Sequence, residues 1–496
     1  MQQLSGADNV SLLAERGNIY NHVGGLIIYD TSTAPGGKVR YKDILKHFED
    51  RLYLNPVFRR HLAATPLGLD RPYLVADTQI DFEYHIRHIA LPKPGDWRQL
   101  MIQVARLHSR PLDRTRPLWE VYVIEGLDNI PNLPAGAFAI FLKIHHAVVD
   151  GMATIHLLTQ LHTLTPEHID PVNAHPIIDA DDSPSTYELL SRTLNNSASR
   201  ISKLARLGIA TSARLLSEGK NQLIHINELD IRSLGDLAKR LLPARAPHTR
   251  FSQKISRNRV LEGFGMPLSH IRHIREKIPG ISLNDIFICV ASGAVRKYLE
   301  AKDELPEKSL MSLMPISLRT DGAAGGNDVG GIQVKICSDI ADPIARLKAV
   351  HHETSTSKAQ AEKMGLDMLK NLFEVMPAML VGTLMRSLIM PSINITTSNV
   401  RGPDKPIYLA GAKVMCMYPV SIPADGAGLN FTGVSYNGTM WVSMVSCRKM
   451  LPDPALMLAC MNESWSELLI AASHLPDLKH KKATRVAPHN RAARQK

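Results

Sequence analysis

The stretch KIHHAVVDG, residues 143–151, holds the side chains best suited to chemistry in this sequence. His145 and His146 are adjacent, and Asp150 and Gly151 follow shortly after them. An imidazole transfers protons near neutral pH because its unperturbed pKa is about 6.5, and it is also a frequent metal ligand. The spacing alone leaves three interpretations open: a catalytic base with its scaffold, half of a metal site, or two histidines of the core.

Two elements must position these residues. The run AFAIFLKI, residues 137–144, is almost wholly apolar, which predicts a strand buried on both faces. From Met152 onward, apolar residues recur at roughly helical spacing. His145, His146 and Asp150 therefore occupy a strand-to-helix turn, where side chains face a crevice close to a helix N-terminus. Gly151 permits backbone conformations that other residues resist.

A histidine at such a turn can take a proton from an alcohol that attacks an acyl group, and then return it to the leaving group. No GxSxG nucleophile elbow occurs in the chain, so direct attack is the simpler route. A metal site lacks a third ligand, since no HExxH motif is present. His145 and Asp150 also fit the HxxxxD pattern of membrane glycerolipid acyltransferases, but no apolar run reaches the ~18 residues of a spanning helix.

The composition, 44% hydrophobic and 21% charged, is typical of a globular protein. The formal charge of +11 includes seven basic residues and no acid after Leu478. This tail either attracts anionic lipid or another polyanion, or is simply solvated. Five scattered cysteines without a CxxC pair favour reduced thiols over zinc binding. The first residues lack the features of a signal peptide. We therefore expect a cytoplasmic protein that is soluble or peripheral to the inner membrane or to lipid inclusions.

Mixed strand and helix signals on both sides of a different segment predict two α/β domains. The expected ranges are an N-terminal domain over 1–175, a connection with a basic amphipathic helix over 176–250, a C-terminal domain over 251–475 and a basic tail over 476–496. Strands are predicted over 22–30, 119–127, 309–319 and 393–400, and helices over 41–56, 97–112 and 282–300, the last with Ser282 as its N-cap. Asn437-Gly438 predicts the tight turn of a hairpin over 429–447.

Ordered motifs extend along most of the chain: LSGAD, HVGGL, RPLWEVYVIEGL, KIHHAVVDG, SLNDIFICVASGAVRKYL, MPISLR, GNDVGG and SNVRGP. With these motifs the sequence resembles the bacterial wax ester synthase/diacylglycerol acyltransferases, in the superfamily of chloramphenicol acetyltransferase and peptide-synthetase condensation domains. The resemblance implies two chloramphenicol-acetyltransferase-like domains, each a mixed β-sheet covered by helices, with a tunnel at their interface. It implies acyl-CoA as donor, a fatty alcohol or diacylglycerol as acceptor, and no cofactor, metal or nucleic acid.

The resemblance also implies residue roles. His146 would be the general base and His145 would support it, while Asp150 would hold the turn, with Arg319 as our candidate for its partner. Asn284 would help to hold the thioester carbonyl or its oxyanion, although it and Asp285 also suit the first turn of a helix, where polar residues satisfy free backbone donors.

Further motif residues are assigned to the substrate passage. Trp119 of the family's motif Pro117-Leu118-Trp119 would brace the tunnel wall or belong to the core. Ser398 and Asn399 would orient substrate or end a strand. Flexible methionines at helical spacing, among them Met364 and Met368, would line the passage, pack in a core or touch a lipid surface.

One residue departs from the family pattern. Arg401 stands where the family usually has proline, and it would meet a CoA phosphate or be solvated. Two rival functions stay open: a superfamily enzyme that uses a carrier-bound donor to form an ester or amide, and a non-catalytic lipid-binding protein. Fatty alcohol and diacylglycerol are both apolar chains that end in a hydroxyl, so the sequence does not rank them.

Overall fold

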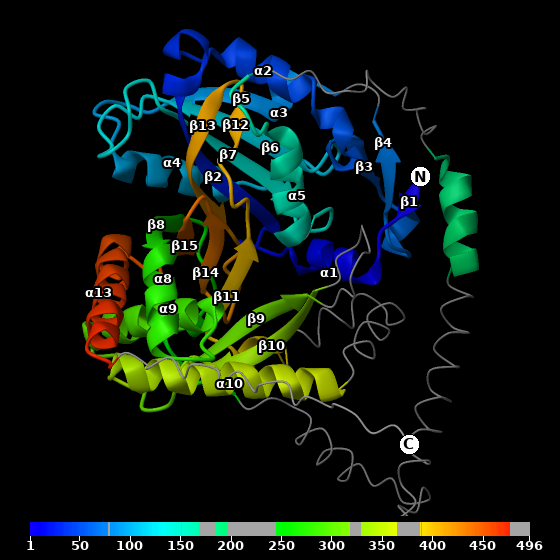
Figure 1. The fold of residues 1–496 in the computed structure, drawn as a ribbon. Helices are drawn as coiled ribbons and strands as arrows, with labels where there is room; N and C mark the ends of the chain where they lie inside the picture. Colours follow the sequence, from blue (N-terminus) through cyan, green and yellow to red (C-terminus); the bar gives the residue numbers. More distant parts are fainter. Residues whose placement is uncertain are drawn as a thin grey trace, which may run out of the picture.

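The computed structural model describes residues 1–77, 80–149, 151–167, 184–196, 245–317, 329–364, 387 and 389–476. Within these ranges the strands form two six-stranded sheets and one three-stranded sheet. The predicted mixed α/β fold with two sheet-containing domains is confirmed (Figure 1).

The first large sheet carries the strand that leads to the two histidines. Its order is β12-β13-β2-β7-β6-β5, and all pairs are antiparallel except β5 with β6. The strands are β2 (His22–Asp30), β5 (Ile86–Ala90), β6 (Trp119–Glu125), β7 (Phe138–His145), β12 (Tyr408–Leu409) and β13 (Ala412–Val420). Every residue of β7 is buried, as the apolar run predicted. The strand is central because β2 and β6 pair with its two edges and helices cover both faces.

Side chains alternate between these two faces. Leu26 and Ile28 pack with α4 (Trp97–His108) on one side of β2, whereas Ile27 and Tyr29 pack on the other side with α2 (Tyr41–Glu49) and α5 (Gly151–Leu161). The predicted helix over 41–56 ends earlier than expected, at Glu49, and short 3-10 turns follow it. The helices packed on both faces hold the sheet in position. They therefore also position the end of β7, where the two histidines lie.

The second large sheet has the order β10-β9-β11-β14-β15-β8, with β11 parallel to both its neighbours. Its strands are β8 (Arg259–Pro267), β9 (Met311–Ser317), β10 (Val329–Lys335), β11 (Ile395–Arg401), β14 (Leu429–Tyr436) and β15 (Thr439–Cys447). Asn437 and Gly438 form the tight turn between β14 and β15, and both have positive φ, which confirms the predicted hairpin.

The third sheet and the remaining helices complete the architecture. The small sheet contains β1 (Gln2–Gln3), β3 (Arg60–Ala63) and β4 (Tyr73–Ala76). The other helices are α1 (Gly6–Ala14), α3 (Phe82–His85), a helix over 186–196, α8 (Leu268–Lys277), α9 (Leu283–Glu300), α10 (Pro343–Met364) and α13 (Pro454–Ser473). Short 3-10 helices are η1 (Thr31–Thr33), η2 (Pro35–Gly37), η3 (Leu52–Leu54), η4 (Pro56–Arg59), η5 (Pro66–Gly68), η7 (Arg250–Ser252) and η9 (Met390–Ser392).

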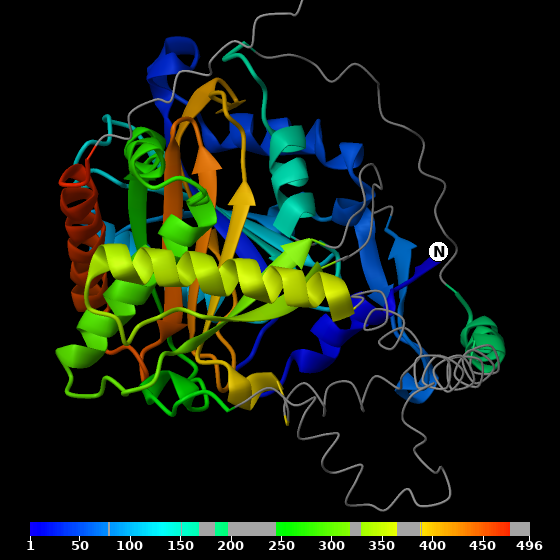
Figure 2. The same cartoon turned by 60° about the horizontal axis from the view of Figure 1, so that its bottom comes forward.

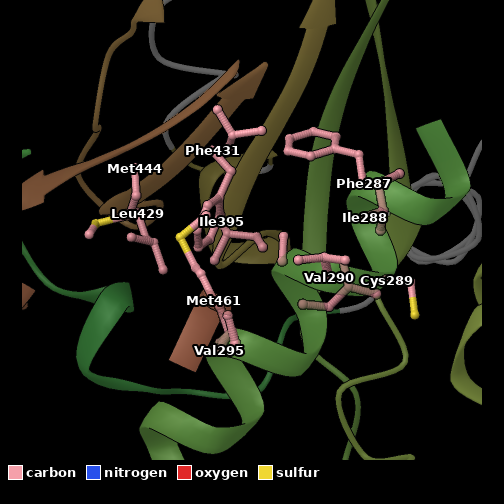
Figure 3. Packing of buried hydrophobic residues seen from close by; sticks show 14 of the residues in the cluster. Phe287, Ile288, Cys289, Val290, Val295, Ile395, Leu429, Phe431, Met444 and Met461 are labelled. Carbon is pink, nitrogen blue, oxygen red and sulfur yellow. The ribbon is translucent and has the colours of Figure 1, made fainter. Parts of the chain in front are cut away.

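Helix α9 forms the centre of the second core. Ser282 caps it as predicted, because its hydroxyl accepts a hydrogen bond from the Asp285 N–H at 3.1 Å. Phe287 and Ile288 of α9 belong to the same buried cluster as Ile395 and Phe431 of the sheet (Figure 3). Helices α8, α10 and α13 contact α9 from outside, and α10 is the long yellow helix in front of this sheet in Figure 2.

The two large sheets do not correspond to two continuous halves of the chain. β12 and β13 come from residues 408–420, yet they extend the sheet of the N-terminal half, where β13 pairs with β2. In Figure 1 the orange β13 lies among the blue and cyan strands. The domain ranges 1–175 and 251–475 stay a prediction. The first large sheet contains strands from both ranges. No helix in the described ranges is long and apolar enough to cross a membrane.

Candidate active site

The two histidines lie at a tight turn between β7 and α5. β7 ends at His145, whose carbonyl accepts a hydrogen bond from the Val148 N–H at 3.1 Å. His146 is the second residue of this turn. Its backbone N–H donates to the Asn21 carbonyl at 2.7 Å, just before β2 begins. The strand-to-helix position predicted from the sequence is therefore confirmed for both histidines.

The ring of His145 is fully engaged by the protein. Its Nδ1 accepts a hydrogen bond from the Ala147 N–H at 3.0 Å, so Nε2 carries the proton and donates to Glu15 at 3.1 Å. The side chain is 1% exposed. With one nitrogen used as acceptor and the other as donor, His145 has no nitrogen left to take a proton from a substrate.

Glu15, at the C-terminal end of α1, is a site residue that no sequence motif indicated. One carboxylate oxygen accepts from His145 and from the Asn21 N–H, while the other lies 2.5 Å from the Arg114 guanidinium. Burial raises the pKa of Glu15, but His145, Arg114 and the Asn21 amide outweigh burial and lower it to about 2. Glu15 therefore ties together α1, the start of β2 and the histidine turn.

We predict that Glu15→Gln destabilises the protein by about 2 kcal/mol near neutral pH, because hydrogen bonds to a charged group are stronger than neutral ones. The folded-state pKa of about 2 lies below the ordinary 4.5. The contribution is therefore complete above pH 4.5 and lost as pH falls toward 2. Urea denaturation of both proteins across decreasing pH measures this, and the gap between them should shrink with acidification. A gap that stays constant with pH contradicts the prediction, and the exposed Glu49→Gln serves as the control.

His146 is held differently from His145. Its backbone is fixed to Asn21, whereas its side chain is only half-buried, in contrast to the fully buried ring of its neighbour. The fold thus places two adjacent identical residues in different surroundings. The His145 ring braces the turn through Ala147 and Glu15, while the His146 side chain keeps part of its exposure to solvent.

Behind the turn lies a group of buried charges. The Lys143 ammonium, fully buried on β7, is 2.8 Å from the Glu120 carboxylate on β6, and Glu120 also accepts from the Tyr122 hydroxyl at 2.8 Å. Burial lowers the pKa of Lys143, and the Glu120 carboxylate opposes that shift. Burial also lowers the pKa of two nearby histidines, His22 and His108, which favours their neutral forms. The mostly apolar strand β7 thus contributes Lys143, two residues before His145, to a buried ion pair with Glu120.

The tripeptide at the start of β6 belongs to the core of the N-terminal half. Pro117, Leu118 and Trp119 are all buried. The Trp119 indole donates to the Phe58 carbonyl at 2.9 Å and stacks on His85 with ring centroids 4.3 Å apart. The Leu118 carbonyl accepts the His145 N–H at 2.9 Å, so this motif supports the turn through the backbone. Its predicted place in a tunnel wall stays a prediction.

Asn284 and Asp285 lie in the first turn of α9. Asp285 is buried, accepts from the Ser282 N–H at 2.8 Å, and also binds Thr354 and His351 of α10 at 2.7 and 2.9 Å. Burial raises its pKa, but these hydrogen bonds outweigh burial and lower it. The half-buried Asn284 amide contacts the Met314 sulfur on β9 at 3.1 Å. Asp285 thus caps and anchors its helix, while the oxyanion role of Asn284 stays a prediction.

Strand β11 brings the remaining motif toward the histidine turn. Ser398 and Asn399 are half-buried on β11, and β11 contacts α5, the helix that follows the turn. Residues more than 200 positions apart in the chain therefore meet at the junction of the two sheets. Arg401, at the end of β11, is 78% exposed and lies 2.6 Å from Asp404, so the surroundings of this side chain are those of a solvated surface residue.

Several predicted residues cannot be placed. Asp150, Arg319 and Met368 lie outside the described residues, as do most of the connection over 176–250 and the tail after Pro476. Met364 is the last residue of α10. Gly151 begins α5. The Asp150–Arg319 pairing and the methionine-lined passage stay predictions.

Other kinds of site find little support in the described ranges. Within them no three histidine, cysteine or acidic side chains gather as a metal site would require. All five cysteines are buried and unpaired, and burial raises the pKa of Cys289 to about 11 and of Cys337 and Cys416 to about 12. A thiol with a raised pKa is a poor nucleophile, since the thiolate is the reactive form.

Family models match most of the chain. Residues 4–287 match the wax ester synthase/diacylglycerol acyltransferase catalytic domain, and residues 325–469 match the C-terminal domain of the same enzymes. A putative diacylglycerol O-acyltransferase of Mycobacterium bovis is 30% identical, covering 93% of this chain and 97% of its own. Another putative diacylglycerol O-acyltransferase, from Mycobacterium tuberculosis, is 31% identical and covers 94% and 99%.

Solved structures agree with this assignment. A wax ester synthase/diacylglycerol acyltransferase from Marinobacter aquaeolei superposes with a TM-score of 0.68 at 28% identity, over 95% of this chain and 100% of the other. The starter condensation domain of rhizomide synthetase superposes with a TM-score of 0.52 at 11% identity, over 96% and 95% of the two chains. At 11% identity, the similarity to the condensation domain shows a shared fold and nothing about function.

Proposed function

Because the chain belongs to the wax ester synthase/diacylglycerol acyltransferase family, and is thus an O-acyltransferase acting on a lipid, we propose that it esterifies a lipid hydroxyl with a fatty acyl group from acyl-CoA, using His146 as general base. Diacylglycerol as acceptor would give triacylglycerol, and a fatty alcohol would give a wax ester. The named activity of the relatives supports both acceptors.

The observation that carries the assignment of the base is that both ring nitrogens of the neighbouring His145 already serve other groups of the protein. Both nitrogens of His145 are occupied by Ala147 and Glu15, so that ring is a positioning group. His146 is half-buried on the same turn and is fixed through its backbone to Asn21. A general base must be held within hydrogen-bond distance of the substrate proton that it removes, and the turn holds the His146 backbone in place.

In the proposed reaction His146 takes the proton from the acceptor hydroxyl as its oxygen attacks the thioester carbonyl. The C–O bond forms while the carbonyl becomes an oxyanion. Collapse of this intermediate breaks the C–S bond, and the proton held by His146 goes to the departing CoA sulfur. No covalent intermediate with the protein is needed, so no nucleophilic side chain is required.

The oxyanion needs donors placed before the reaction begins. Asn284 is our candidate, and its amide would have to exchange the Met314 sulfur for the substrate oxygen. A sulfur is a weak acceptor, so this exchange costs little. Asp150 would keep the turn closed, with Arg319 as its partner.

The acceptors are apolar lipids, which partition into membranes and lipid inclusions. We therefore extend the proposal to an enzyme that acts at such a surface, peripheral to it. The basic tail after Leu478 has the charge to strengthen attraction to anionic lipid.

The test of this function is release of free CoA from palmitoyl-CoA by the purified protein, with hexadecanol or dioleoylglycerol presented in detergent micelles. We expect release that depends on the acceptor, with formation of the matching ester by mass spectrometry. The ratio of kcat/KM values ranks the two acceptors. Release without any acceptor would indicate a thioesterase, and lipid binding without release would favour a non-catalytic lipid-binding protein. Turnover only with an acylated carrier protein would favour the condensation-type alternative.

A further inference from the structure

A cleft of about 870 Å³ separates α4 of the N-terminal half from β8 and the start of α13. These three elements lie on the same side of the molecule in Figure 1. A smaller hollow of about 290 Å³ adjoins it and shares Arg106, Ser109 and Asn258 with it. Neither hollow is lined by the histidine turn.

The two hollows are lined by exposed arginines on both halves of the protein. These residues are Arg98, Arg106, Arg110, Arg257 and Arg448. Within the described ranges none of the five is paired with a carboxylate. Gathering like charges without counter-charges raises the electrostatic free energy of the folded protein, and a bound anion would lower it.

Three carboxylates line the larger cleft, fewer than the five arginines, and their hydrogen-bond or ion-pair partners are groups other than these arginines. Asp96 caps α4 by accepting the Gln99 N–H at 2.8 Å. Glu262 is buried, which raises its pKa, and it accepts the Trp97 indole N–H at 3.0 Å. Asp453 lies 2.5 Å from the Lys302 ammonium.

The larger cleft also has an apolar and aromatic lining. Met101, Ala105, Val260 and Leu261 are buried beneath it, and the Trp97 side chain is held at its wall by Glu262. Arginines at the rim above an apolar floor suit a ligand that joins a planar base to several phosphate groups.

The smaller hollow lies close to the proposed base. Tyr20 lines it, and the carbonyl of the next residue, Asn21, accepts the His146 N–H at 2.7 Å. Arg110 also lines it, and the Arg110 carbonyl accepts from Lys143, two residues before His145. A chain that leaves the larger cleft through this hollow therefore arrives beside the segment that holds the histidine turn.

We propose that this arginine-lined cleft binds the phosphorylated adenosine part of acyl-CoA. This proposal rests on the proposed use of acyl-CoA as the donor. The 3′-phosphate and the diphosphate contact the arginines, and the pantetheine arm passes through the smaller hollow toward His146. Arg401, which is exposed and already next to Asp404, is not part of this site.

The test compares palmitoyl-CoA with palmitoyl-pantetheine, a donor that lacks the nucleotide. Arg106→Glu/Arg448→Glu should raise KM for palmitoyl-CoA by at least about tenfold, the loss expected for about 1.4 kcal/mol of binding. KM for palmitoyl-pantetheine, which has no phosphate, should not change. Both arginines are exposed, so the folded state should survive their replacement. The matched control is Arg272→Glu, an exposed arginine on α8 outside both hollows, which should leave both KM values unchanged.

Calorimetry with adenosine 3′,5′-bisphosphate gives a readout that does not depend on catalysis. The wild type should bind it, with affinity falling as salt increases, and the double variant should not. Equal KM changes with both donors, or bisphosphate binding that the variant retains, would overturn the proposal. So would unchanged KM values with weaker binding to phosphatidylglycerol vesicles, which would make the arginines a lipid-facing surface. Bisphosphate binding by a wild type that transfers no acyl group would keep the site and reject the proposed function.

Discussion

Replacing His146 with alanine is expected to lower kcat for acyl transfer by about 10²–10⁴-fold, the usual contribution of a general base. Melting temperature should fall less than in His145→Ala, because the His146 side chain is only half-buried and its backbone hydrogen bond to Asn21 is retained by alanine. The measurement is acceptor-dependent CoA release, together with thermal unfolding. KM for palmitoyl-CoA should stay near the wild-type value, since the base acts on the acceptor hydroxyl.

The adjacent histidine supplies the control. His145→Ala removes a fully buried ring and leaves the Glu15 carboxylate without one of its partners, so it should destabilise the protein by about 2–4 kcal/mol. A variant of His146 that keeps more than about a tenth of wild-type kcat would reject it as the base. If His145→Ala lost activity with no loss of stability, the assignment of the two roles would have to be exchanged.

The second large effect concerns stability. Glu120→Ala should cost about 3–5 kcal/mol, because it leaves the Lys143 ammonium buried without a counter-charge. Among the described residues, Lys143 would keep the Leu107 and Arg110 carbonyls, at 3.5 and 3.1 Å. Urea denaturation at pH 7 measures the loss. Glu125→Ala, on the same strand β6, is the matched control, since Glu125 is 44% exposed beside His88 and should cost less than about 1 kcal/mol.

A double variant checks the physical cause. Glu120→Ala/Lys143→Met removes both charges, so it should be more stable than Glu120→Ala alone despite carrying one more substitution. If the double variant were the less stable of the two, the loss in Glu120→Ala would come from packing and from the Tyr122 and Arg87 contacts of Glu120 instead.

The local elements followed from local sequence signals. Alternation and apolar runs placed β2, β6 and β7, the Asn437-Gly438 pair placed the β14–β15 hairpin, and Ser282 placed the start of α9. Such signals work because side-chain periodicity, caps and turn residues act within a few positions of the chain. The position of the histidine turn between a buried strand and a helix followed in the same way.

Long-range pairings left no comparable signal. Nothing in the residues of Ala412–Val420 indicates that this strand would pair with β2, because the hydrogen bonds between strands involve backbone groups that nearly all residues share. Lys143 looked like one polar residue at the end of an apolar run, and its Glu120 partner became apparent only when β6 and β7 were seen side by side.

The sequence by itself thus determined the family, the mixed α/β elements and the presence of two histidines at a strand-to-helix turn. The tertiary structure decided the surroundings of each ring: both nitrogens of His145 are hydrogen-bonded, and the His146 side chain is half-buried. Glu15 lies 130 positions before His145, and only the packing of α1 against the turn brings its carboxylate to Nε2. Hydrogen bonds across such separations depend on the whole fold, so the different surroundings of two adjacent, identical residues can be read only from the folded chain.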